Sequence, residues 1–241
     1  MPRDFYVYDE NVLRDAEITQ YSALASGLDI SLVVEPSLSP QARFLTTNPL
    51  VVFAFATPVM VDSVAVLATN AISTVVAFEG TSCTLRHDGS KVSVAMLPEP
   101  LLVRTMAYWL TGTPGTPTAV GGLYAGMKKG LPRNAARPIT ALGRMDLAQR
   151  TLGGHGYGMR RIPLKRYEYE FPWVSLDDKN TMETIAIANQ AHVPHIINPY
   201  PEADDAFPPA YVTLYEPNLS FERRGNNPPT YTTRMEWQEA R

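Results

Sequence analysis

The fold is decided by LVVFAFATPVMVDSVAVLATNAISTVVAF, residues 50–78, which contains three short apolar runs. The runs are Leu50–Phe55, Ser63–Leu67 and Thr74–Phe78, and each is rich in Val, Ala and Phe or Leu. Because turn-forming residues separate them, each run predicts a short β-strand. Leu50–Phe55 is apolar throughout, without the alternation of a half-exposed strand, so we expect a central strand that is covered on both faces.

The same pattern continues beyond this stretch. Further strand candidates are Cys83–Arg86, Val92–Met96 and Leu102–Leu110. Strands that recur about every ten residues, with turn signals between them, are typical of sandwiches and jelly rolls. We therefore predict a mainly β protein in which residues 1–126 form a β-sandwich of the jelly-roll kind. Asp88-Gly89 predicts a compact hairpin turn between two of its strands.

The composition is that of a globular protein, with 45% apolar residues and 21 prolines spread along 241 residues. A formal net charge of -3 gives no general attraction to nucleic acid or to an anionic membrane. No apolar run is long enough for a membrane span, and MPRDFYVYDENVL lacks the order of a signal peptide, so we expect folding in the cytosol. Cys83 is the only cysteine, which we expect to be a buried, inert thiol.

Residues 127–166 differ from the rest of the chain in charge. They contain one acid, Asp146, and ten cations: Lys128, Lys129, Arg133, Arg137, Arg144, Arg150, Arg160, Arg161, Lys165 and Arg166. Three interpretations stay open: a solvated surface, docking onto an acidic neighbouring subunit, and binding of a nucleic-acid backbone. The third is the least favoured, because base-stacking aromatic residues are almost absent here. We place a domain junction at residue 126, where the composition changes.

Residues 127–241 are predicted to form a second, β-rich domain with one short helix. In RYEYEFPW, residues 166–173, aromatic and charged residues alternate, as in a strand with one buried face. Ser175 and Asp178 have the spacing of a helix capping box. The chain ends on a predicted β-hairpin, residues 218–241, whose last strand has one face made of Tyr231, Thr233, Met235 and Trp237.

No residue pattern predicts catalysis or a bound metal. His192 and His195 are the best metal candidates, but histidines in an extended, proline-interrupted segment point in different directions. Asp177 and Asp178 stand at a helix start, where acids interact favourably with the helix dipole and diverge from each other. GGHGYG, residues 153–158, lacks the ending of a phosphate loop. We predict no catalytic residue, no cofactor and no metal, and a protein that is not an enzyme.

Four stretches together resemble proteins of long-tailed bacteriophages. RFLTTNPLVVFAFATPVMVDSVAVLATNAISTVVAFEG (43–80) and YWLTGTPGTPTAVGGLYAGMKKGLPRN (108–134) resemble the galactose-binding-like, discoidin-type sandwich of minor tail proteins. RTLGGHGYGMRRIPLKRYEYEFPWVSLDD (150–178) and YEPNLSFERRGNNPPTYTTRMEWQEAR (215–241) resemble distal tail and baseplate subunits, in which a strand is followed by a short helix and a last hairpin. The resemblance implies a galactose-binding-like N-terminal sandwich and a C-terminal assembly domain.

The resemblance also implies a structural subunit of the virion at the tail tip, assembled in the host cytoplasm. Such subunits form rings, commonly hexamers, between the tail tube and hub, baseplate or fibre proteins. The closing hairpin would then join a neighbour's sheet, and the basic segment would meet an acidic surface. The residues expected to contact other subunits are Lys128, Lys129, Arg133, Arg137, Arg160, Arg161, Phe221, Tyr231 and Trp237.

The alternative is a carbohydrate-binding module that attaches the particle to a glycan of the host surface. Sandwiches of this family bind sugars through aromatic and polar residues on loops. Here Tyr108, Trp109 and Tyr124 lie on predicted strands or near turns, and we expect Trp109 to pack in the core. The structural role is therefore preferred to glycan binding.

Overall fold

The computed structural model describes residues 5–131, 164–189, 193–199, 208–215, 219–225 and 228–240, and the backbone of residues 139–143, 147–150 and 156–159. The chain is mainly β, with one α-helix among these residues. Its contacts form two compact units. Unit 1 consists of Met1–Leu131, His195–Tyr211 and Ala240–Arg241, and unit 2 of Pro132–Pro194 and Val212–Glu239. This grouping differs from a single junction at residue 126, because two later segments belong to unit 1.

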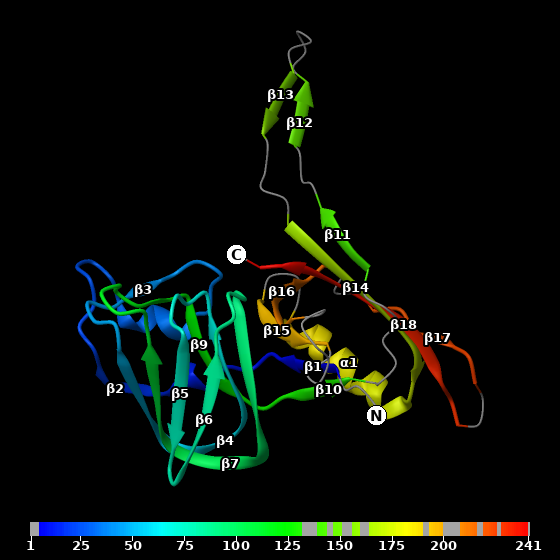
Figure 1. Cartoon of the computed structure of the whole chain (residues 1–241). Coiled ribbons are helices and arrows are strands. Elements are labelled where there is room, and N and C mark those ends of the chain that lie inside the picture. The colour runs from blue at the N-terminus through cyan, green and yellow to red at the C-terminus, as the bar shows by residue number, and fades with distance from the viewer. Residues whose placement is uncertain are drawn as a thin grey trace. The chain divides into compact units, whose positions relative to one another are not determined.

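Two long strands organise unit 1. β4 (Leu50–Leu67) and β7 (Val92–Thr111) pair antiparallel along most of their length (Figure 1). The register shifts twice, between Ala54 and Val59 and between Val61 and Ser63. The sequence predicted two separate strands within each of these segments, and that prediction was wrong. The prolines of both strands stand where the ladder is already interrupted by the shifts, so no regular ladder hydrogen bond is lost there.

Because of these shifts, the same two strands contribute to two layers. The first layer contains the first residues of β4 and the last residues of β7. Its strand order is β2-β4-β7-β5-β6, which adds β2 (Glu17–Tyr21), β5 (Ser73–Phe78) and β6 (Thr81–Arg86). In the second layer β4 pairs with β9 (Gly122–Gly126). Phe53 and Tyr108 of the first layer share one buried core with Val64 and Leu123 of the second. Unit 1 is therefore a β-sandwich, as predicted.

The second layer is buried on both of its faces. Residues 61–67 are buried without exception, whereas Leu50–Phe55 alternates between half-buried and buried positions. The prediction of a doubly covered strand was therefore wrong for Leu50–Phe55, and the covered segment is the one that contains Asp62 and Ser63. Its second face packs on Tyr8 of β1 and on residues of the unit's two later segments, Ile196, Tyr211 and Ala240.

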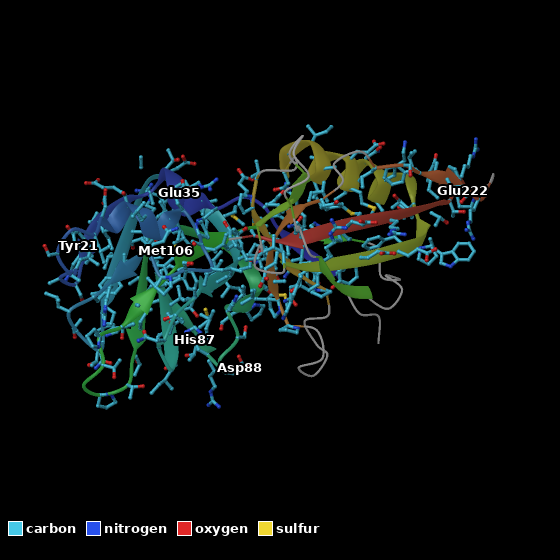
Figure 2. All side chains as sticks on the ribbon, turned by 90° about the horizontal axis from the view of Figure 1, so that it is seen from above. Tyr21, Glu35, His87, Asp88, Met106 and Glu222 are labelled. Atoms are coloured by element: carbon cyan, nitrogen blue, oxygen red, sulfur yellow. The ribbon has the colours of Figure 1, made fainter. Side chains whose placement is uncertain are left out.

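Short elements complete unit 1. β1 (Phe5–Tyr8) pairs with β10 (Lys129–Leu131) and with β15 (His195–Asn198). The remaining elements are β3 (Ala42–Arg43), β8 (Ala119–Val120) and the 3-10 helices at Val12–Asp15 and Ile30–Val34. Buried Met106 of β7 lies in the interior of this unit (Figure 2).

The tight hairpin of this sheet is at Glu79-Gly80 and not at Asp88-Gly89, where the sequence predicted one. Phe78 lies opposite Thr81, so Glu79-Gly80 forms the tight β5–β6 hairpin, with Gly80 at a φ of 87°. Asp88-Gly89 also makes a turn, in which the Ser90 amide donates to Asp88 Oδ1. However, β5 lies between β6 and β7, so the predicted hairpin at Asp88-Gly89 is wrong.

In unit 2, two strands and one helix dominate. β14 (Leu164–Val174) and β18 (Tyr231–Glu239) pair antiparallel, with Tyr167 opposite Trp237. β18 also pairs with the last residues of β16 (Ala210–Leu214) and with β17 (Glu222–Arg223). The helix, α1 (Leu176–Asn189), follows β14 directly and buries Met182 and Ile185.

The capping box of α1 is confirmed. Ser175 Oγ accepts a hydrogen bond from the Asp178 amide at 3.1 Å, and Asp178 Oδ2 accepts from the Ser175 amide at 3.3 Å and from Ser175 Oγ at 2.7 Å. This reciprocal arrangement satisfies backbone donors that a helix start leaves unpaired. The Asp178 carboxylate therefore has a structural role as part of the helix cap.

His87, the residue after β6, connects β5 and β7 at one end of unit 1, beside Asp88 (Figure 2). Its Nε2 lies 2.8 Å from Thr74 Oγ1 and its Nδ1 lies 2.8 Å from Ser93 Oγ. Burial lowers the pKa of His87, and the nearby Asp88 carboxylate raises it by less. The imidazole is therefore neutral in the folded protein near pH 7.

This geometry predicts acid sensitivity of unit 1. Below the unfolded histidine pKa of about 6.5, the unfolded chain binds a proton that folded His87 does not, so the free energy of unfolding decreases with falling pH. We expect His87→Gln, which cannot titrate, to show a smaller decrease between pH 7 and pH 5. Thermal melts followed by circular dichroism measure both slopes, and equal slopes would contradict the assignment.

Candidate interaction surfaces

The two lysines expected at a subunit contact are paired within unit 1. Lys128 Nζ lies 3.9 Å from Asp62 Oδ2 and 5.2 Å from the ring centre of Tyr6, and the Lys128 amide donates to Asp62 Oδ1 at 2.8 Å. Lys129 Nζ donates to Asp9 Oδ2 at 2.7 Å. Both carboxylate side chains are buried, so these lysines balance charges inside their own unit.

Arg133, Arg137, Arg160 and Arg161 lie outside the described residues, so their contacts stay a prediction. The backbone around them is informative. Ile139 of β11 (Ile139–Gly143) lies opposite Glu168 of β14, and Gly143 lies opposite Leu164.

A second ladder is nested inside the first. β12 (Leu147–Arg150) pairs with β13 (Gly156–Met159), with Leu147 opposite Met159 (Figure 1). Both ladders lie within residues 139–168, which we call the basic arm. Among the described elements, β12 and β13 pair only with each other. The arm has two acids, Asp146 and Glu168, and six cations: Arg144, Arg150, Arg160, Arg161, Lys165 and Arg166.

Phe221 and Tyr231, two more predicted contact residues, pack within unit 2. Their rings are 6.4 Å apart in an edge-to-face arrangement. Lys179 of α1 places its Nζ 5.4 Å from the centre of each ring. Both aromatic side chains are half-buried. They attach the closing hairpin to α1 through cation–π and ring contacts.

Trp237, the last predicted contact residue, is fully buried at 0% exposure. Its indole packs edge-to-face against Tyr169, with ring centres 5.6 Å apart. The closing hairpin exists, since Glu222 lies opposite Thr232. However, β18 is paired on both sides, with β14 on one and with β16 and β17 on the other. β18 therefore does not offer an edge to a neighbour, and Trp237 is a core residue; that the hairpin joins another sheet through β17 stays a prediction.

Two other tryptophans are exposed, and the sequence misassigned one of them. Trp109 of β7 is 55% exposed, while its neighbours Tyr108 and Leu110 are fully buried. The prediction of core packing for Trp109 was wrong, because successive strand residues point to opposite faces and its face is the outer one. The signal available in the sequence was its position between two apolar residues. Trp173, near the end of β14, is 61% exposed.

The helix α1 has a row of four exposed, uncharged residues. Leu176, Asn180, Thr184 and Ile187 recur at helical spacing, and Leu176 and Ile187 are 47% and 74% exposed. Of the charged residues of the helix, which are Asp177, Asp178, Lys179 and Glu183, the last borders this row, because it lies seven residues after Leu176 and four before Ile187. We call this surface the uncharged stripe. Its two large apolar side chains, Leu176 and Ile187, lie near the two ends of the helix.

The remaining candidates are the histidines considered as metal ligands and the single cysteine, Cys83. His195 is buried at the start of β15, and His192 lies outside the described residues. In the part of the chain that the structure describes, no group of three or more His, Cys, Asp or Glu is arranged to hold a metal ion. Cys83 is half-buried, and burial raises its pKa to about 11, so the thiol stays protonated at neutral pH.

As for membranes, no helix within the described ranges combines the length and apolar character that crossing a bilayer requires.

Comparison with known proteins gives distant likeness in structure alone. No protein-family model matches the chain, and no curated protein matches its sequence. A family 32 carbohydrate-binding module from Streptococcus pneumoniae EndoD is similar in structure, with a TM-score of 0.40 and 12% sequence identity. The match covers 48% of this chain and 99% of that module.

The tryptophans of unit 2 give a test of core against surface. We expect Trp237→Ala to reduce the free energy of unfolding by about 3–5 kcal/mol, because it removes a buried ring and leaves a cavity. Trp173→Ala, the matched control, should change it by less than about 0.5 kcal/mol. Urea denaturation followed by far-ultraviolet circular dichroism measures both. Equal losses would contradict the division into a core and a surface tryptophan.

Proposed function

We propose that this chain is a non-enzymatic structural subunit of the tail tip or baseplate of a long-tailed bacteriophage. In this role it joins other copies of itself and neighbouring tail proteins into a ring between the tail tube and hub or fibre proteins. The resemblance of four sequence stretches to tail proteins supplies the class. The basic arm is the observation that supports an assembly role most directly.

A two-stranded hairpin is a poor structure to leave in water. It has no second layer on which to bury side chains, and isolated hairpins are at best marginally stable. In the described backbone, β12 and β13 have no further strand partner, so each has an outer edge with unpaired backbone groups. A neighbouring protein that covers the arm would bury its side chains and pair with the backbone groups of its outer edges.

The charge of the arm indicates the kind of neighbour. Six cations and two acids give it a strongly positive character, although the whole chain has a net charge of -3. A positive element attracts an acidic surface over several ångströms and orients it before contact. Such complementarity selects the partner and its register more than it adds affinity. The acidic remainder of another copy is a suitable surface.

The uncharged stripe would add burial of apolar surface between copies to the charge contacts of the basic arm. Leu176 and Ile187 are large, exposed side chains on a rigid helix, and the residues between them along the stripe are neutral. Burial of apolar surface is the main favourable term in association. If the stripe of one copy meets a different surface on the next, the contact is heterologous and closes into a ring when the rotation allows.

Shortening the arm tests the proposal. Gly143 lies opposite Leu164, so replacing residues 144–163 by Asn-Gly closes the hairpin with a favourable two-residue turn. We expect a folded protein with an unchanged melting temperature, because the β12–β13 ladder is separate from the other ladders described. Incorporation into purified virus particles, measured by immunoblot, should fall at least about tenfold. Normal incorporation of the shortened protein would contradict the proposal.

A charge variant separates the arm's charge from its shape. Arg160→Glu with Arg161→Glu should reduce incorporation, whereas Arg43→Glu with Arg104→Glu makes the same change in net charge elsewhere and should not. Electron microscopy of antibody-labelled particles locates the protein. Label on the capsid, or no label on particles at all, would exclude a tail-tip role.

A further inference from the structure

The outer face of the first layer of unit 1 presents an aromatic ring in the middle of a sheet. Leu50, Trp109, Val75 and Thr84 stand side by side on β4, β7, β5 and β6. Trp109 is 55% exposed and Val75 is also exposed. An exposed indole at the centre of four paired strands is held by a rigid backbone, unlike an aromatic residue on a loop. We call this surface the Trp109 face.

Small residues leave the indole accessible. The next row across the same strands is Val52, Ala107, Ala77 and Ser82. The side chains of Ala107 and Ala77 are single methyl groups, so they do not cover the indole. Leu50 and Val52 are half-buried on this face, which explains why Leu50–Phe55 is apolar throughout although only its inner side faces the core.

Around the ring, the exposed polar groups are hydroxyls. Thr84, Ser82, Thr105 and Thr111 are all exposed and belong to the same strands. Hydroxyl groups both donate and accept hydrogen bonds. The charged residues of this face stand at its two ends: Arg86 opposite Ser73 at one, and Glu79 beside Thr105 with Glu17 opposite Ala54 at the other. The central part is therefore neutral, with one aromatic ring and a border of hydroxyls.

We propose that the Trp109 face is a binding site for a neutral carbohydrate, with a pyranose ring stacked on the indole of Trp109. A sugar ring has a face of C–H groups that suits the negative π-face of an aromatic ring, and its hydroxyls project at the edge. The serine and threonine side chains offer matching donors and acceptors at that edge. A neutral surface favours a neutral glycan over a phosphorylated or sulfated one, which would need cations near the ring.

The size of the apolar area supports this occupant over a protein. Stable protein interfaces bury about 800 Å² on each partner and centre on several large anchors. Here the large apolar side chains of the two central rows are Trp109, Val75, Leu50 and Val52, and the last two are only half-exposed. A single sugar unit covers an indole and its hydroxyl border without needing more apolar surface.

This site is independent of the basic arm and of the ring. A lone stacking site gives weak binding, and several copies in one particle would multiply it through avidity. The site would then give the assembled structure an attachment activity that no assembly contact supplies. Because it lies on unit 1 and the arm belongs to unit 2, loss of one leaves the other testable.

The test is a screen of the purified full-length chain on an array of neutral and acidic glycans. Titration with the best-binding neutral oligosaccharide follows, measured by calorimetry and by tryptophan fluorescence. We expect saturable binding to a neutral glycan that Trp109→Ala weakens at least about tenfold. Trp109→Phe should retain part of the affinity, because it keeps a ring. Trp173→Ala, which removes the other exposed indole, should bind as wild type, and all variants should melt at similar temperatures.

Three outcomes would overturn the assignment. They are no binding to any neutral glycan, binding that Trp109→Ala leaves unchanged, and capture of a protein partner through Trp109 without glycan binding. The shortened-arm protein should bind glycan like wild type. Failure of the glycan test therefore leaves the assembly proposal intact, and failure of the particle test leaves the glycan site intact.

Discussion

In unit 1, the ladder between β4 and β7 is the constraint from which the other contacts follow. The two strands stay paired through two register shifts, so one pair of strands contributes to two layers. Each half must then find its own neighbours: β2 and β5 for one, β9 for the other. The core that holds Phe53 and Val64 together exists only because the strands change layer between them. The outer face of the first layer is left to solvent, with Trp109 on it.

Local patterns predicted the elements that local physics decides. The sequences around Thr74–Phe78 and Ser175–Asp178 specified a strand and a capping box, because strand formation and helix starts depend on neighbouring residues. The segments of β4 and β7 that contain prolines were predicted to lie between strands, whereas each of these prolines stands in a bulge of its own strand. Asp88-Gly89 was misinterpreted as a hairpin, because a turn does not determine which strands lie together in the sheet.

Alternation reveals that a strand has two unlike faces but not what covers them. Trp237 and Trp109 show this from opposite directions. Trp237 was expected at a contact and is fully buried, because β18 is an internal strand of its sheet. Trp109 was expected in the core and is exposed, because its apolar neighbours in sequence are the ones that face inward. Counting charges in the sequence likewise does not show which charges are already paired. Lys128 and Lys129 belong to a basic segment, yet they form ion pairs with Asp62 and Asp9.

The two proposed activities depend on different physical forces and respond differently to the medium. Contacts of the basic arm rest on charge, which salt screens within about 8–10 Å at physiological ionic strength. Stacking on Trp109 rests on a neutral ring and on hydroxyl groups, which salt screens little. An assembly formed through charge in the cytoplasm and an attachment formed outside it would face different conditions. Because separate forces maintain the two surfaces, each can be optimised without weakening the other.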